Sequence, residues 1–364
     1  CTGCGACAAA CPGGALRMEE DREGFLYPAL EAACTDCGLC REACPLRRED
    51  PAPSPAACFG ARAREDRVRL LGSSGGIFPL LAARVLADGG SVWGAAMDPD
   101  GVVRHREIRS PEDLPAIART KYVQSDLAAV WEGLRDPAAR GRPVLFCGTP
   151  CQTDAVRVRL GEDRGGWILA DLICYGVPSP GIWRRYGAWL ERRYRGPLHS
   201  FSFRDKRNRD SGRTCAALIG EKELVWPLGR DLYCRSYFSR VNLRPSCFRC
   251  RYCTPDRSSD LTLGDFWGIE TVRPGFDDGM GCSAVLCRTE AGEALWRRVR
   301  QETEWFACGV EEIAQAAGVH GGAARTGGVY GPLAAAPLLP LAPAFPAAVT
   351  APILLRRRVV HGNV

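Results

Sequence analysis

The sequence predicts a small cysteine-rich module followed by a larger mixed domain, a fold class of the α+β or α/β type. Two observations predict this. The spacing C-x2-C-x2-C-x3-C-P occurs twice before residue 46, and from about residue 58 apolar strand-like segments alternate with helical ones. We therefore expect a module at 1–48, a proline-rich linker at 49–57, a large domain at 58–325 and a Pro/Ala-rich tail at 326–364.

The repeated cysteine motif is typical of bacterial ferredoxins that hold two cubane iron–sulfur (4Fe-4S) clusters. In such modules three thiolates come from one motif and the fourth comes from the other motif. By this rule the first cluster has Cys1, Cys4, Cys7 and Cys44, and the second has Cys34, Cys37, Cys40 and Cys11. We expect the first cluster to be the more fragile one, because the sequence begins on its ligand Cys1.

Zinc and disulfides are the alternative explanations for these cysteines. Structural zinc usually takes two separate cysteine pairs or cysteine–histidine mixtures, and the first hundred residues contain no histidine. Disulfides belong to oxidising compartments and mostly to small secreted domains. The chain has 20 cysteines, no recognisable signal peptide and enough length to fold without covalent links. We expect a reduced, cytoplasmic protein that is sensitive to oxygen and comes from an anaerobic host.

Composition argues against nucleic-acid and membrane functions. The 364 residues are 46% hydrophobic and 25% charged, which is ordinary for a globular protein. The net charge of +6 is modest, and its arginines are interrupted by apolar residues, as on solvated helix faces. The uncharged stretch at 331–355 contains too many prolines for a helix that spans a membrane.

The large domain shows buried strands that end in loops rich in glycine and proline. In open α/β sheets such loops, at the carboxyl ends of strands, are where ligands bind. Beyond residue 198 the pattern becomes more strand-like. We expect strands at 91–97, 143–147, 167–174, 201–206 and 261–268, and helices at 77–86, after residue 152, at 181–195 and at 290–302.

A second group of cysteines suggests a third cluster. Cys151 and Cys174 each follow a predicted buried strand, which is a poor place for a core side chain. Cys247 and Cys250 form a C-x2-C pair that Cys253 extends, so Cys253 is an alternative fourth ligand. Single cysteines in strands are usually small buried hydrophobes. We apply that simpler interpretation to Cys215, Cys282, Cys287 and Cys308.

Two polar loops suggest a site for a phosphorylated cofactor. Ser73–Gly76 precedes a predicted helix, where small residues and the helix N-terminus favour a diphosphate, although such a loop is often just a turn. The segment Lys121–Asp126 combines a cation, an aromatic ring and hydroxyls. It suits a phosphate and a flat ring, or it is an ordinary strand edge. No standard dinucleotide or P-loop motif is present.

In order and spacing, the motifs resemble the beta subunit family of coenzyme F-420 hydrogenase/dehydrogenase, in its bacterial form with an N-terminal two-cluster 4Fe-4S ferredoxin module. The resemblance covers roughly residues 1–290. The segments that carry it, besides the ferredoxin motif, are 73–78, 121–126, 148–152, 171–174, 176–180, 203–206, 244–247 with Cys250, and 264–268.

The resemblance implies a large domain that binds FAD beside a 4Fe-4S cluster, and an N-terminal module that connects this site to a redox partner. Lys121 and Tyr175 are the residues expected to orient a substrate. Family positions imply cluster ligands at Cys151, Cys174, Cys247 and Cys250. They imply flavin contacts at Ser73, Ser74, Gly75, Gly76, Lys121, Tyr122, Gln124, Ser125 and Thr149.

Tyr175 departs from the family, which commonly has histidine there, and Arg119-Thr120 replaces smaller residues. Both lie near the expected active site, so the substrate stays open between F-420 and another hydride carrier. The expected function is an oxidoreductase that passes electrons between the clusters and FAD, and so to or from a small molecule. The expected partner is ferredoxin or a redox subunit, and homo-oligomers are left open. The alternatives are a non-catalytic electron-transfer subunit and a zinc-stabilised interaction protein.

Overall fold

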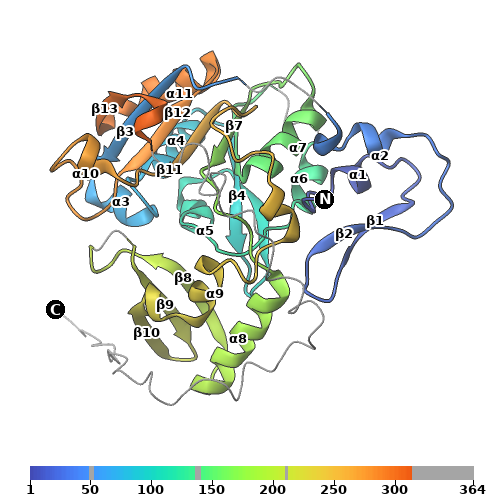
Figure 1. Ribbon diagram of the computed structural model, residues 1–364, viewed down its shortest axis with the longest axis horizontal. Coiled ribbons are helices and arrows are strands. Elements are labelled where there is room, and N and C mark those ends of the chain that lie inside the picture. The colour runs from blue at the N-terminus through green and yellow to red at the C-terminus, as the bar shows by residue number, and fades with distance from the viewer. Residues whose placement is uncertain (49–52, 136–140, 210–211, 314–364) are drawn as a thin grey trace.

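The computed structural model describes residues 1–48, 53–135, 141–209 and 212–313. Within them a mixed eight-stranded sheet forms the centre of the large domain, in the order β13-β3-β12-β11-β7-β6-β4-β5 (Figure 1). The cysteine-rich module precedes it, so the predicted fold class is confirmed. Residues 49–52 of the expected linker and the whole expected tail at 326–364 lie outside the described residues.

The sheet has a parallel centre with antiparallel strands on both sides. Its parallel strands place their carboxyl ends at one edge, where ligand sites form in such sheets. β5 (Val103–Ile108) pairs antiparallel with β4, while β12 (Ser283–Cys287), β3 (Ala57–Ala63) and β13 (Thr303–Cys308) extend the other side. The parallel strands are β4 (Ser91–Met97), β6 (Val144–Gly148), β7 (Trp167–Leu172) and β11 (Leu261–Asp265).

Helices cover both faces of this sheet because its strands are apolar on both sides. Along β6, Leu145 belongs to the core on one face, and Phe146 belongs to the core on the other. The first face carries α3 (Asp66–Leu71), α4 (Ile77–Ala87), α5 (Leu114–Ile117) and α11 (Glu290–Val299). The second carries α6 (Ala128–Gly133) and α7 (Pro150–Leu160), and the short α10 (Ile269–Val272) packs in a third cluster.

A smaller antiparallel sheet lies below the large sheet in the view of Figure 1. It is built from β8 (Leu198–Asp205), β9 (Thr214–Ile219) and β10 (Lys222–Pro227). Two helices, α8 (Pro180–Tyr194) and α9 (Leu232–Phe238), complete it. Its core is largely aromatic. The ring centroid of Trp183 lies 5.1 Å from those of Phe201 and Phe203 and 5.2 Å from that of Tyr233.

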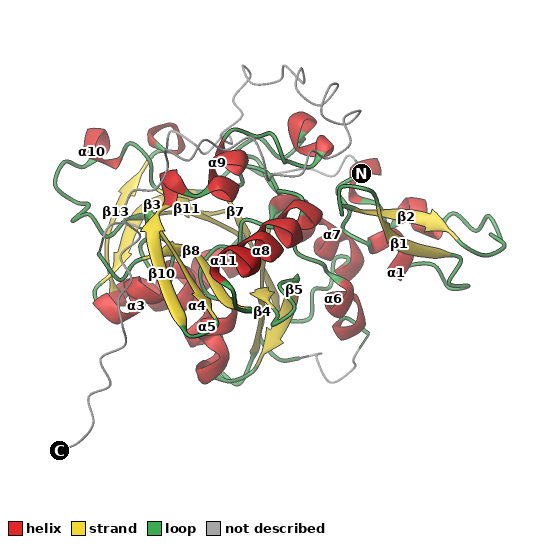
Figure 2. Ribbon diagram, turned by 90° about the horizontal axis from the view of Figure 1, so that it is seen from below, coloured by secondary structure: helices red, strands yellow, loops and turns green. Residues whose placement is uncertain are grey.

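The N-terminal module consists of two short helices and one hairpin, and it projects to the side of the large domain (Figure 2). Its elements are α1 (Ala6–Ala9), β1 (Leu16–Glu20), β2 (Leu26–Leu30) and α2 (Leu39–Glu42). The module packs on the α6–α7 face, where Ala6 is buried in the same cluster as Trp131. Trp131 Nε1 also donates to the carbonyl of Cys4 at 2.9 Å.

Most elements expected from the sequence are confirmed. β4 has the predicted bounds, and α4 ends one residue later than expected. β7 ends at Leu172, two residues early, because the chain leaves the sheet to position Cys174. α11 ends at Val299 and continues as a 3₁₀ turn, Arg300–Glu302. None of the helices in the described part of the chain combines the length and apolarity that crossing a membrane requires.

Candidate functional site

The two ferredoxin motifs have matching backbone geometry. Gly5 and Gly38 follow the second cysteine of each motif, and both have a left-handed conformation, with φ of 77° and 79°. Such values favour glycine because a Cβ is strained there. Each glycine starts a short helix, so Cys7 and Cys40 project from the first helical turn. The same turn is thus built twice around two sets of thiols.

The environments of these thiols support the crossed pairing of ligands. Burial raises the pKa of the Cys4 thiol, and the neighbouring thiols of Cys7 and Cys44 raise it further. Burial likewise raises the pKa of Cys7, and the thiols of Cys44 and Cys40 raise it further. Cys44 therefore lies near Cys4 and Cys7, as the crossed pairing predicts, while Cys40 of the second motif also lies near Cys7. At Cys11 desolvation acts upward, but nearby backbone N–H groups outweigh it and lower the pKa.

The four cysteines expected to hold a third cluster lie together. Cys151 is in the first turn of α7, Cys174 follows β7, and Cys247 sits in the 3₁₀ turn Pro245–Arg249. Burial raises the pKa of Cys174, and the thiols of Cys247, Cys151 and Cys250 add to this rise. The four side chains converge from three loops, two of which follow the carboxyl ends of β6 and β7. Such convergence suits a cubane better than a single ion, which needs closer ligands.

Cys253 lies beside this set and interacts with Cys250. A hydrogen bond from the Cys253 thiol lowers the pKa of Cys250 to about 7, despite its burial. The same bond raises the pKa of Cys253, with burial as the second cause. The two thiols are therefore coupled through this hydrogen bond, and iron binds the thiolate form of either one. Cys250 stays the predicted ligand, and Cys253 stays the alternative.

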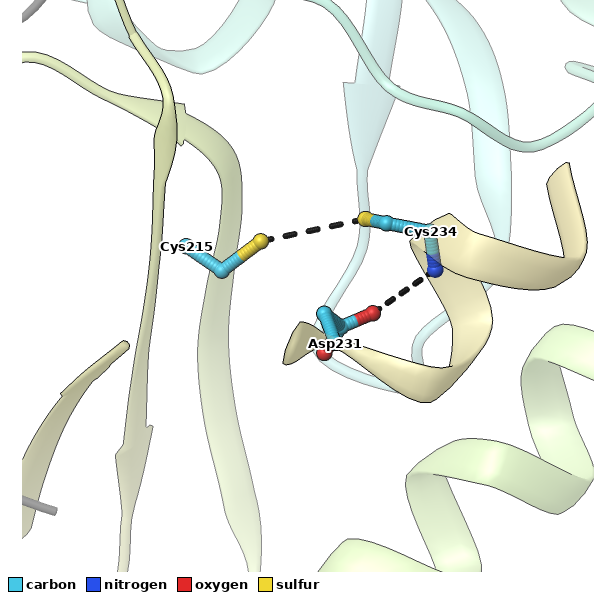
Figure 3. Close-up of side chains that lie close together, drawn as sticks. All are labelled: Cys215, Asp231 and Cys234. Atoms are coloured by element: carbon cyan, nitrogen blue, oxygen red, sulfur yellow. Dashed lines mark hydrogen bonds between the residues drawn. The ribbon is translucent and has the colours of Figure 1, made fainter. Parts of the chain in front are cut away.

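Another buried group has closer ligand atoms but does not suit a metal ion. Cys215, Asp231 and Cys234 place three potential ligand atoms within 4.8 Å of one another (Figure 3). Both carboxylate oxygens of Asp231 are already hydrogen-bonded, one to the Cys234 N–H and the other to Tyr186 and Trp226. Its hydrogen bond with Cys215, followed by burial, raises the pKa of Cys234, so this thiol stays protonated. The group stabilises the start of α9.

A pocket opens at the carboxyl edge of the parallel strands. Ser73, Ser74 and Gly76 line it at one side, and Gly148, Thr149 and Cys174 line it at the other. Gly75 lies behind the lining, because a Cβ there would come 2.4 Å from the carbonyl oxygen of Ala61. The predicted loop therefore does form a wall of a pocket. The same pocket reaches one of the four clustered cysteines.

The hydroxyls of the serine loop hold it in place. Ser73 Oγ accepts the backbone N–H of Thr120 at 2.7 Å, and Ser74 Oγ donates to the carbonyl of Cys282 at 2.8 Å. Lys206, which is fully buried, donates to the carbonyl of Ser74 at 2.6 Å. The first backbone N–H groups of α4 follow directly after this fixed loop. A helix N-terminus presented by such a loop attracts anions.

The segment 121–126 is divided between the pocket and its surroundings. Lys121, Tyr122 and Ser125 line the pocket, whereas Gln124 does not. Lys121 Nζ donates to the carbonyls of Ala116, Ala118 and Arg119, which uses all three donors of an ammonium group. The lysine therefore holds the preceding loop. Gln124 instead donates to the carbonyl of Thr2, in the N-terminal module, at 2.8 Å.

The pocket wall is positively charged. Arg119, Lys121 and Arg204 line it together with one carboxylate, Asp265. Arg204 donates to Asp265 at 2.5 Å, and Arg119 donates to the carbonyl of Leu70 at 3.0 Å. Burial lowers the pKa of Lys121 to about 7, so the two arginines supply most of the positive charge. Beside a helix N-terminus this charge favours an anionic ligand. The sequence analysis did not name Arg204 as a site residue. It named only the segment 203–206, which carries part of the family resemblance and contains Arg204.

Aromatic residues surround the outer part of the pocket. Tyr122 stacks on Tyr237 with ring centroids 4.6 Å apart. Phe238 and Trp267, both lining the pocket, remain 37% and 48% exposed. The Tyr175 hydroxyl donates to the carbonyl of Phe238 at 2.7 Å and accepts from Arg240 at 2.9 Å. Trp267 belongs to the segment 264–268 that carries the family resemblance, whereas Phe238 lies in no motif.

His105 also lines the pocket, although it belongs to no motif. Its Nε2 lies 3.0 Å from the carbonyl of Cys147, and its ring stacks on Phe146. Because a carbonyl only accepts, Nε2 carries the proton, and Nδ1 is the unprotonated nitrogen. Burial lowers the pKa of His105 to about 4, and the charge of Lys121 contributes to the shift. The imidazole is neutral at physiological pH.

Comparison with known proteins assigns both parts of the chain. Residues 1–47 match the 4Fe-4S dicluster domain, which defines an iron–sulfur protein of the ferredoxin class. Residues 141–311 match the model for the C terminus of the coenzyme F420 hydrogenase/dehydrogenase beta subunit. The two matches thus place a dicluster module ahead of a segment that is similar to the C terminus of that beta subunit. The resemblance seen in the motifs is confirmed.

One solved structure illustrates the likeness. It is described as "Xenon derivatization of the F420-reducing [NiFe] hydrogenase complex from Methanosarcina barkeri". A chain of it is 19% identical, with a TM-score of 0.47, and the match covers 73% of this chain and 86% of that one. This similarity is too distant to carry a functional comparison. No curated protein matches the chain.

Proposed function

We propose that this protein is an iron–sulfur flavoprotein oxidoreductase. It would hold FAD in the pocket and a third 4Fe-4S cluster at Cys151, Cys174, Cys247 and Cys250. One observation carries the proposal: the pocket extends from the Ser73–Gly76 loop to Cys174, so its ligand lies beside the clustered thiols. No further carrier is needed between the two sites. The N-terminal module supplies the link to an external donor or acceptor.

The chemistry of the pocket fits a flavin dinucleotide. The start of α4, with Arg119 and Arg204, offers N–H groups and positive charge for a diphosphate. Tyr122 and the other rings offer flat apolar surface for an isoalloxazine. A bound flavin exchanges two electrons as hydride on one side and single electrons with clusters on the other. Gly148 and Thr149 also line the pocket.

The residues at the mouth suit a small aromatic substrate. Phe238 and Trp267 expose ring surface there, and Arg240 lies 5.0 Å from the Tyr175 ring centroid. These groups would stack a planar hydride carrier, either F-420 or a similar compound, against the bound flavin. The hydroxyl of Tyr175 is held by the Phe238 carbonyl and by Arg240. With the hydroxyl held in this way, the face of the Tyr175 ring would orient the ring of the hydride carrier. Lys121 would act indirectly, because its donors fix the loop of the pocket wall.

The partner would dock on the outer side of the N-terminal module. Cys34 and Cys37 of the second motif are exposed there, and Leu30 and Leu39 expose 62% and 42% of their surface. Exposed apolar residues around an accessible cluster site suit a transient contact with a ferredoxin or a redox subunit. The description of the matched family as a beta subunit supports a larger assembly. We expect this assembly in a reducing, cytoplasmic compartment.

Anaerobic purification with quantification of iron, acid-labile sulfide and flavin tests the proposal. Three four-iron clusters and one flavin predict about twelve irons and about one FAD per chain. About eight irons without flavin would instead indicate an electron-transfer subunit with no catalytic site of its own. Zinc without sulfide would remove both interpretations. Bleaching of the flavin absorbance by reduced ferredoxin would then test the connection between the sites.

A further inference from the structure

A buried arginine connects the N-terminal module with the proposed third cluster. Arg244 is 0% exposed and extends into the contact between the two parts of the chain. Its Nε donates to the carbonyl of Cys1 at 3.1 Å, and its Nη2 donates to the carbonyl of Leu26 at 2.8 Å. Its Nη1 donates to Gln124 Oε1 at 2.9 Å. The side chain is therefore held in one position.

The backbone of Arg244 serves the opposite site. Arg244 is the N-cap of the 3₁₀ turn that carries Cys247, and its carbonyl accepts the Cys247 N–H at 2.9 Å. Gly3, between two ligands of the first cluster, packs against the guanidinium so closely that a Cβ would come 2.6 Å from Nη1. One residue thus contacts the loop of the first cluster with its side chain and the loop of the third with its main chain.

The charge of Arg244 is unusual because no carboxylate in the described part of the chain contacts it directly, and Asp21 acts on it only through its charge. Arg257, buried to a similar extent, pairs with Asp171 at 3.2 Å. Among the described residues no ion pair includes Arg244, and its guanidinium instead faces the rings of Tyr27 and Phe25 at 4.2 and 5.2 Å. A buried charge without a partner is costly. Some other negative group is therefore expected to offset it.

The nearest candidates are the cysteine sets themselves. Burial lowers the pKa of Arg244, while Tyr27, the thiols of Cys247 and Cys151, and the carboxylate of Asp21 act against this effect. A cubane with four thiolates is anionic, and each added electron makes it more so. Cluster potentials depend on net charge, hydrogen bonds and exposure. A fixed cation in a low-dielectric junction therefore favours the reduced form.

On the proposed function we infer that Arg244 is a positioning residue whose guanidinium charge lies between the first and third clusters and raises the reduction potentials of both. The second cluster, with ligands at Cys34, Cys37 and Cys40, belongs to the outer side of the module and feels this charge less. Arg244 would thereby favour electron residence at the junction between module and large domain. Its hydrogen bond to the Cys1 carbonyl also fixes the loop that supplies the first ligand.

The test compares Arg244→Met with Arg244→Lys in the full-length, anaerobically loaded protein. Redox titration followed by electron paramagnetic resonance measures the potential of each cluster. Arg244→Met should lower the ratio of reduced to oxidised third cluster at a fixed potential by at least about tenfold, which is about 59 mV for a one-electron couple. The second cluster should move much less. Arg244→Lys should stay close to the unmodified protein, because it keeps the charge.

Gln124→Leu is the matched control for the hydrogen bonds. It removes an acceptor of Arg244 and the bond to Thr2 without changing any charge. If Gln124→Leu lowers the potentials as much as Arg244→Met, the charge is not the cause and the inference is wrong. It is equally wrong if Arg244→Met, loaded with iron, leaves the first and third potentials unchanged. If Arg244→Met does not take up iron, the Arg244→Lys variant decides. Lowered reduction potentials of its first and third clusters would overturn the inference, and unchanged potentials would support it.

Iron content separates this inference from the proposed function. About twelve irons with unchanged potentials in Arg244→Met would refute the role of Arg244 and leave the third cluster standing. About eight irons in the unmodified protein would refute the third cluster. The titration would then test Arg244 on the first cluster alone, whose ligand Cys1 it contacts directly. A shift there relative to the second cluster would support its electrostatic role.

Discussion

Cys174 is the residue that belongs both to the pocket and to the proposed third cluster. Replacing it by alanine should lower the iron content from about twelve to about eight per chain, since one cubane loses a ligand. Bound flavin should fall as well, because the wall of the pocket changes beside it. Iron and flavin quantification after anaerobic purification measures both effects.

Cys308 provides the matched control for this substitution. Burial raises its pKa to about 12, and it packs in an apolar cluster away from the other thiols of the site. Cys308→Ser should therefore keep about twelve irons. Equal iron loss in the two variants would mean that Cys174 has no special role as a ligand.

His105 gives the protein a defined sensitivity to acid. Its pKa falls from 6.5 to about 4 on folding, chiefly through burial, so the unfolded chain takes up the proton first as pH falls. The contribution of neutral His105 to the free energy of unfolding is complete above about pH 6.5. It is lost progressively as the pH falls toward about 4, and the loss is about 2 kcal/mol at about pH 5. Anaerobic melting temperatures at about pH 7.5 and about pH 5 should show this loss.

The variant His105→Gln isolates the contribution of the imidazole. Glutamine keeps an N–H donor for the Cys147 carbonyl but does not titrate. Its melting temperature should therefore fall less between the two pH values than that of the unmodified protein. An identical fall in both proteins would show that other groups cause the acid sensitivity.

At the level of elements, α9 depends on one residue at its start. Asp231 caps the helix through the Cys234 N–H and also accepts from Tyr186 and Trp226. Loss of an N-cap costs about 1 kcal/mol, and each buried donor left without a partner costs about 1–3 kcal/mol. Asp231→Ala should therefore lower the unfolding free energy by about 3 kcal/mol or more.

Asp231→Asn separates capping from the remaining contacts. Its amide oxygen can still cap α9, while its amide nitrogen no longer accepts from the donors of Tyr186 or Trp226. The melting temperature should fall in the order unmodified, Asp231→Asn, Asp231→Ala. Because α9 carries Tyr237 and Phe238, flavin release should follow the same order. A stable Asp231→Ala protein would contradict the role of this cap.

At the level of the whole molecule, the position of the module depends on a close contact of two backbones. A Cβ on Gly181, in the first turn of α8, would come 2.4 Å from the carbonyl oxygen of Glu23 in the module hairpin. Gly181→Leu should push the hairpin away while both parts stay folded and loaded. The rate of flavin reduction by a one-electron donor that acts through the module should then fall, as stopped-flow absorbance would show.

Gly187 lies on the same helix and serves as the control. A Cβ there would meet only Leu198 at 3.5 Å, an ordinary contact distance. Gly187→Ala should therefore keep the rate of the unmodified protein. If Gly187→Ala also reduced the flavin slowly, the cause would be a change in α8 itself and not the position of the module. An unaffected Gly181→Leu variant would show that electrons reach the flavin without the module in this position.

Sequence reasoning succeeded where function depends on local spacing. The cysteine motifs, the bounds of β4 and the glycine loop before α4 all follow from patterns shorter than about a dozen residues. It could not divide the segment 121–126, in which Tyr122 lines the pocket while Gln124 reaches Thr2 in the module. Nor could it find His105 or Phe238, which have no motif and are placed by β5 and α9.

The sequence by itself determined that the chain carries a dicluster iron–sulfur module and a family-specific large domain, because ligand spacing and turn chemistry are local properties of the chain. Only the tertiary structure decided that the pocket reaches Cys174 and that Arg244 joins the two parts. These relations bring together residues far apart in sequence. They depend on how the sheet, the small β-domain and the module pack, which no local pattern specifies.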